Sequence, residues 1–117
     1  MLMEARGLLL RGWSKGAQAR DGRGQIVNAW SGDAASWSLV GALLSSWQRH
    51  DDKLDEDFVA HSAEARALSE ATQALARTTG TLALDSWNDA PERTRSHVIA
   101  AIDRGLSLLH TDTAEAV

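Results

Sequence analysis

The sequence contains no cysteine, no tyrosine and only one proline among its 117 residues. Without cysteine, the chain can form neither disulfides nor metal sites or catalytic centres based on thiolates, and we expect a reducing, cytoplasmic location. The longest apolar run covers residues 39–44, whereas a membrane-spanning helix needs about 20 apolar residues. Residues 1–10 lack the basic start and the long apolar core of a signal peptide. We therefore expect a soluble protein without membrane contact.

The net charge of -4 is unevenly distributed along the chain. Residues 1–28 carry five basic and two acidic side chains, whereas the rest of the chain carries seven basic and fourteen acidic ones. A basic segment of this kind can mark a nucleic-acid surface. The basic residues are dispersed and have few aromatic neighbours, however, which is more typical of a solvated surface. Weak nucleic-acid binding through this part is therefore the least favoured of the functions considered.

Five of the six aromatic residues are tryptophans, at positions 13, 30, 37, 47 and 87. A packed ring of this size buries about 150–250 Å², so a few of them can dominate a small core. We therefore expect most of the tryptophans in the core. The alternative is that one or two of them line a groove for a partner or a flat ligand.

The first third of the chain predicts a helix followed by a hairpin. Apolar residues recur at helical spacing over residues 2–9, and Gly12 follows as a residue that ends helices. Asp21-Gly22 then lies between two short extended-looking runs, at residues 17–20 and 25–28. Glycine accepts the positive φ of a tight turn, so this pattern predicts two short antiparallel strands.

A second helix is predicted to begin at a cap, Ser31 or Asp33, and to end near Arg49. Its apolar stripe, which we expect in the core, contains Trp37, Val40, Leu44 and Trp47. The opposite side carries the small residues Ser38, Gly41 and Ser45. Exposure to solvent is the favoured interpretation of this flat side. The alternative is close approach of another chain, so these three residues are the candidate contacts of a homodimer.

The third helix is predicted over residues 56–78, with Asp55 or Asp57 as its cap and Gly80 at its end. An acidic connection, residues 50–57, precedes it, and His61 follows one turn later. These carboxylates and imidazoles do not have the spacing of a helical zinc site. We therefore predict no metal site.

The last helix is predicted to follow Trp87 and its polar neighbours. Asp89 and Glu92 have the spacing of a capping box, and Thr94 offers a second possible cap if residues 91–93 form a preliminary turn. Trp87 is expected to be largely buried at the end of the core, with Asp89 as the cap. Apolar residues at positions 98, 99, 102, 106 and 109 define the buried face of the helix.

Together, these patterns predict a mainly α fold. The expected architecture is a compact domain of about four helices, with a small β-hairpin between the first and the second. A chain of 117 residues with 44% hydrophobic residues has enough apolar surface for one core. We predict one domain over residues 1–111 and a frayed polar tail over residues 112–117.

The segment from Trp87 to Thr94 also holds the best candidates for chemistry. The candidate binding residues are Trp13, Trp87, Asn88, Asp89, Arg93, Thr94 and His97. The amide, carboxylate, guanidinium and imidazole groups among them could hold an anion or activate a water molecule if a pocket opened beside the indole. No nucleophile, base and orienting group occur at a recognisable spacing, so we predict neither a catalytic residue nor a cofactor. A structural anchor is the favoured interpretation of the segment.

Three short motifs connect the sequence to a known family. They are Gly12-Trp13-Ser14-Lys15-Gly16, Gly41-Ala42-Leu43, and Trp87-Asn88-Asp89 followed by Arg93-Thr94 and Val98-Ile99. With these motifs the chain resembles a family of small bacterial and phage proteins that is catalogued only as a domain of unknown function. The resemblance covers most of the chain. It implies a compact small domain but no particular activity.

The function that the sequence favours is a non-catalytic protein-binding or assembly module. Its partner would be another protein or a second copy of the chain in a homodimer. The first alternative is a small ligand-binding domain or enzyme that uses the segment from Trp87 to Thr94. Nucleic-acid binding through the basic amino-terminal part is the second alternative.

Overall fold

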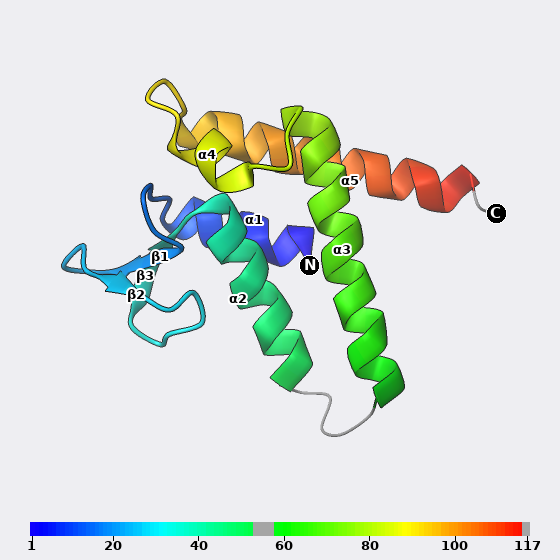
Figure 1. Cartoon of the computed structure of the whole chain (residues 1–117), viewed down its shortest axis with the longest axis horizontal. Coiled ribbons are helices and arrows are strands. Elements are labelled where there is room, and N and C mark those ends of the chain that lie inside the picture. The colour runs from blue at the N-terminus through cyan, green and yellow to red at the C-terminus, as the bar shows by residue number, and fades with distance from the viewer. Residues whose placement is uncertain (53–57, 116–117) are drawn as a thin grey trace.

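The computed structural model describes residues 1–52 and 58–115, which form five helices and a small antiparallel sheet (Figure 1). The helices are α1 (Leu2–Arg11), α2 (Leu39–Asp52), α3 (Phe58–Thr79), α4 (Leu84–Asp89) and α5 (Arg95–Glu115). The strands are β1 (Ala19–Asp21), β2 (Ile26–Val27) and β3 (Ala34–Trp37). The predicted mainly α fold with a small sheet between the first two long helices is confirmed.

The core lies where α1 packs against α2 and α5, with α3 lying across α5 (Figure 1). The apolar face of α1 is fully buried, as its spacing predicted. The largest completely buried apolar side chains are Trp37, Leu9, Leu39, Leu75 and Ile102. These residues come from α1, β3, α2, α3 and α5, so the apolar faces of distant segments share one core.

The three strands pair in the order β2-β1-β3. The hairpin of β1 and β2 is confirmed, and the Asp21 carboxylate accepts hydrogen bonds from the backbone amides of Arg23 and Gln25 at the turn. The third strand was not predicted, because Trp37 was assigned to the stripe of a helix. Its backbone N–H and C=O instead bond to Gly12 and Ser14, which extends the sheet edge toward α1.

Helix α2 begins later than predicted, and the Oγ of Ser38 accepts a hydrogen bond from the N–H of Gly41 at its start. The predicted caps Ser31 and Asp33 are therefore wrong, since both precede β3. The predicted exposed side of this helix is also wrong, because Ser38, Gly41 and Ser45 are buried within the chain. A Cβ atom on Gly41 would collide with the backbone carbonyl of Gln18. Glycine is needed at position 41 so that α2 can pack closely on the segment that leads into β1, and these three buried positions offer no surface to a second chain.

Helix α3 ends at Gly80, which has a φ of 79° and donates its N–H to the carbonyl of Ala76. This end was predicted, because glycine adopts left-handed backbone angles without a steric penalty. The predicted caps at the start of α3, Asp55 and Asp57, lie outside the described residues. The short helix α4 was not predicted, because only one helix was expected after Gly80.

Helix α5 has the predicted buried face, with Val98 and Ile102 fully buried. His97, Arg104 and Ser107 are exposed on its other side, also as predicted. The helix continues to Glu115, beyond the point at which the polar tail was expected to begin. In the part of the chain that the structure describes, no helix is both long and apolar enough to span a membrane.

Candidate functional site

The predicted site residues around Trp87 lie against the loop that follows α1. This loop, residues 12–16, passes over α4 and the start of α2. Asn88 is at the centre of the contact and is completely buried. Its Oδ1 accepts hydrogen bonds from Trp13 Nε1 at 2.8 Å and from the backbone N–H of Leu39 at 3.1 Å.

The amide nitrogen of Asn88 is used as well. Its Nδ2 donates to the carbonyl of Ser14 at 3.1 Å and to Oδ1 of Asp89 at 3.0 Å. An Asn side chain has two donor hydrogens and an acceptor oxygen with two lone pairs. All four are engaged here, so Asn88 has no remaining polar capacity for a ligand. It joins three separate segments of the fold instead.

Asp89 does not cap the last helix, so that prediction is wrong. It is the last residue of α4, and its Oδ1 accepts the backbone N–H of Gly16 at 3.0 Å. Lys15 approaches the same end of α4 and donates its Nζ to the carbonyl of Ala90 at 2.7 Å. These contacts hold the loop after α1 against the end of α4, and they use Asp89, which the sequence had offered for ligand binding.

Trp87 is half-buried rather than largely buried, because its ring lies between the core and the side chain of Arg93. The guanidinium carbon of Arg93 is 4.0 Å from the centroid of the indole, a cation–π distance. Arg93 Nε also donates to the carbonyl of Trp87 at 2.9 Å. Arg93 is thus held against Trp87 by two contacts.

The cap of α5 is Thr94, the second of the two predicted positions. Its Oγ1 accepts from the N–H of His97 at 3.4 Å, and Nδ1 of His97 accepts from the N–H of Thr94 at 3.2 Å. This reciprocal pair is a capping box in which His97 takes the place of the usual Glu or Gln. Both side chains are exposed, and both are occupied in starting the helix.

Within the described residues, the contacts of the candidate residues are mainly with one another and with the loop after α1, so they form a structural junction. Asp89 lines a small cavity of about 210 Å³ together with Asp85, Ser38 and residues 16–18, and Trp87, Asn88, Arg93 and His97 do not line it. No group of three or more His, Asp or Glu side chains that could hold a metal ion occurs within residues 1–52 and 58–115. The arrangement supports anchoring more than it supports chemistry.

Most basic side chains of the amino-terminal part are engaged within the chain. Arg6 forms an ion pair with Asp103 at 2.7 Å, and Arg20 donates to the carbonyls of Lys15 and Gly24. The guanidinium of Arg11 lies 5.5 Å from the ring centroid of Trp37. Each of these guanidinium groups therefore has a contact within the chain.

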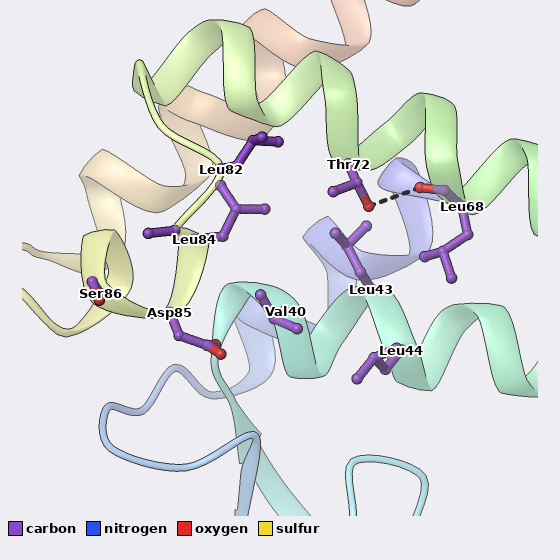
Figure 2. Close-up of a pocket in the computed structure, with 10 residues that line it drawn as sticks. Val40, Leu43, Leu44, Leu68, Thr72, Leu82, Leu84, Asp85 and Ser86 are labelled. Carbon is purple, nitrogen blue, oxygen red and sulfur yellow. Dashed lines mark hydrogen bonds between the residues drawn. The ribbon is translucent and has the colours of Figure 1, made fainter.

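A different feature, an apolar groove, was missed by sequence reasoning. Helices α2 and α3 run side by side (Figure 1), and a groove of about 410 Å³ lies between them and residues 82–86, which include the start of α4 (Figure 2). The groove is lined by Val40, Leu43, Leu44, Leu68, Thr72, Leu82, Ala83, Leu84, Asp85 and Ser86. Figure 2 shows leucines of α2 and α3 facing one another across it. The apolar stripe of α2 suggested only core packing, so the sequence did not indicate a groove.

The rim of the groove combines an exposed leucine with an acidic residue. Leu82 is 75% exposed, the largest fraction among the exposed large hydrophobic residues of the described chain. Asp85 is also exposed, and within the described residues its carboxylate has no ion-pair or hydrogen-bond partner. No basic side chain lines the groove. Its surface is therefore apolar along its length and negative at the α4 end.

Comparison with known proteins identifies the family of the chain. The model of a family of unknown function, DUF6197, matches residues 1–107. The chain belongs to this family. No curated protein and no solved structure matches the chain.

Two of the three motifs of the resemblance meet at Asn88. Trp13 comes from the first motif, Asn88 is the centre of the third, and Leu39 precedes the Gly41 motif by two residues. The first and third motifs are far apart in the sequence, but the hydrogen bonds of a single amide group connect them to each other and to the start of α2. In this family member, the most specific sequence pattern therefore corresponds to the junction that holds α1, α2 and α4 together.

Proposed function

We propose that this protein is a non-catalytic binding module that holds an amphipathic helical segment of a partner protein in the groove between α2 and α3. The observation on which this proposal depends is the groove itself, with half-buried Val40, Leu44 and Leu68 along it and exposed Leu82 at its rim. An apolar groove between two helices is the usual receptor for one apolar face of a third helix.

The size of the groove supports this occupant. A ligand site commonly has a volume of about 300–1,000 Å³, and the groove has about 410 Å³. This space suits a short row of aliphatic side chains at positions i, i+3 or i+4, and i+7 of a docked helix. Leu82 at the rim would lose much of its water contact on docking, which favours binding because burial of apolar surface is favourable.

The charge of the groove favours a basic residue in the partner. The Asp85 carboxylate lies at the end of the groove near the start of α2 (Figure 2), and no cation lines the groove. A Lys or Arg at the matching end of the docked helix would complement this charge. We therefore propose a partner segment that is apolar on one face and basic at one end.

The engagement of the alternative site residues supports a binding role over catalysis. All four hydrogen-bonding positions of Asn88 are used, and Arg93 is held against Trp87.

We propose a cytoplasmic location as part of the same hypothesis, because a chain of 117 residues without cysteine suits a reducing compartment.

A panel of synthetic amphipathic peptides tests the proposal. Each peptide has leucines at positions i, i+3, i+4 and i+7 and a terminal lysine, and its binding is measured by fluorescence anisotropy and by amide chemical shifts. We expect at least one peptide to bind with a dissociation constant on the order of 100 μM or tighter. The amide shifts should involve Val40, Leu44, Leu68 and Leu82.

The variant Leu82→Glu should weaken peptide binding by about tenfold or more, because it places a charge in the apolar contact. The matched control is Ile26→Glu, which changes a 67% exposed aliphatic residue on β2, away from the groove. Replacing the terminal lysine of the peptide with glutamate should also weaken binding, and Asp85→Asn should remove that difference. The proposal is wrong if no peptide binds with a dissociation constant below about 1 mM. It is also wrong if Leu82→Glu and Ile26→Glu weaken peptide binding to the same extent.

A further inference from the structure

The outer face of α1 has an organisation that the fold of one chain does not explain. The residues of this face are Met3, Glu4, Gly7, Leu10 and Arg11, and all five are exposed. Met3 is 65% and Leu10 is 49% exposed, although both are large apolar residues. The opposite face of α1, which contains Leu2, Ala5, Leu8 and Leu9, supplies the buried contacts of the helix.

Gly7 lies at the centre of this outer face. A helix advances by about 100° per residue, which places Met3 and Leu10 on one side of Gly7 and Glu4 and Arg11 on the other. Apart from the neighbouring backbone of α1 itself, no atom of the described residues lies within 4 Å of the position that a Gly7 Cβ would occupy. Glycine is unfavourable inside a helix, and no internal contact requires it here. Its absent side chain leaves the backbone of α1 open to close approach from outside.

We propose that this face binds the same face of a second copy of the chain, with the two α1 helices antiparallel and crossing at Gly7. A twofold axis through this crossing pairs residues that lie on opposite sides of Gly7 in the sequence. Met3 then lies beside Leu10 of the second copy, and Glu4 lies beside Arg11 of the second copy. Each of these contacts occurs twice.

The charge pattern of the face favours a second copy of the chain as the partner, and it favours the antiparallel direction of the two α1 helices. In the antiparallel arrangement, the acidic residue of each copy meets the basic residue of the other, on the same side of the contact. In a parallel arrangement about a twofold axis along the helices, the two sides of the face are exchanged, so Glu4 would lie beside Met3 and Arg11 beside Leu10 of the other copy, and neither charge would meet a charge of opposite sign. The apolar pair is also brought together only when the helices run in opposite directions. The face is therefore complementary to itself in one orientation.

The contacts that these residues make within one chain are compatible with the contact between copies. The Arg11 guanidinium lies over the ring of Trp37 at 5.5 Å, and Glu4 also has an interaction within the chain, yet both side chains remain exposed. A stable protein interface usually buries about 1,200–2,000 Å², whereas α1 has only ten residues. We therefore expect a weak dimer, with a dissociation constant on the order of 100 μM.

Sedimentation equilibrium from about 10 μM to about 1 mM tests this inference. The mass should rise from 12.6 kDa toward twice this value as the concentration increases. Glu4→Arg and Arg11→Glu should each weaken the dimer by about tenfold, because each places like charges together. The double variant with both changes should restore the dimer to within about threefold of the unchanged chain, since the pair is only exchanged. Gly7→Gln should abolish it by blocking the close approach.

The matched controls are Glu92→Arg and Arg104→Glu, which reverse exposed charges outside α1 and should leave the mass unchanged. Circular dichroism of every variant confirms that the monomer is folded. A monomer at about 1 mM would overturn the inference, as would a dimer that the two single charge reversals do not weaken or that the double variant does not restore.

The inference is independent of the proposed groove, because no residue of α1 lines it. Leu82→Glu should therefore leave the self-association unchanged.

Discussion

The indole Nε1 of Trp13 donates a hydrogen bond of 2.8 Å to Oδ1 of Asn88, 75 residues further along the chain. The same oxygen accepts the first backbone N–H of α2, from Leu39. One buried amide therefore fixes the loop after α1, the start of α2 and the end of α4. A buried network of this kind stabilises a fold strongly when every member has a partner, and its loss is correspondingly costly.

Replacing Asn88 with alanine should destabilise the protein by about 3–4 kcal/mol, because the N–H of Trp13, the N–H of Leu39 and the carbonyl of Ser14 would lose their partner. Trp13→Phe removes only the indole N–H and part of the ring, and it should cost about 1–2 kcal/mol. Urea unfolding measures both values. The matched control is Ser86→Ala, which replaces an exposed residue of α4 and should change the free energy of unfolding by no more than about 0.5 kcal/mol. A small effect of Asn88→Ala would show that the junction is not essential for the fold.

Replacing each of two helix glycines with alanine should change the stability of the protein in opposite directions. Gly41→Ala should cost about 3 kcal/mol or more, because the new Cβ would collide with the backbone of Gln18. Gly7→Ala should stabilise the chain by up to about 1 kcal/mol, because alanine favours the helix and nothing within 4 Å of the new Cβ opposes it. Thermal unfolding at about 5 μM, below the expected self-association, compares the two variants. Equal effects of the same sign would contradict the burial of Gly41.

Thr94→Ala should destabilise α5 by about 0.5–2 kcal/mol, since it removes the oxygen that caps the helix. Thr94→Ser keeps that oxygen and should retain most of the stability. The neighbouring exposed residue provides the control, because Ser96→Ala lies inside the helix and should have little effect. Urea unfolding of these three variants, together with Asp89→Ala, distinguishes the cap from the loop contact. A Thr94→Ala variant as stable as the unchanged chain would contradict the assignment of the cap.

The sequence predicted α1, α3, α5 and the hairpin of β1 and β2 because their signals are local. The apolar spacing of α1 and α5 follows from the repeat of the helix, and Gly80 ends α3 through the positive φ that glycine accepts. Asp21-Gly22 indicated the hairpin for a similar local reason. The cap at Thr94 was one of two predicted positions, and only the turn before it decides between them. These features depend on residues within a few positions of one another.

The tertiary structure decided which surfaces are buried and which are open. The small side of α2 looked exposed in the sequence, yet it is buried, because the backbone of Gln18 packs against Gly41. Val40 and Leu44 looked like core residues but are half-buried and line a groove between α2, α3 and residues 82–86. Asn88 looked like a binding residue, and only contacts from residues 13, 14 and 39 show that its amide is used. Local patterns specify which faces are apolar or small, whereas the neighbour of each face depends on contacts between segments that are distant in the sequence.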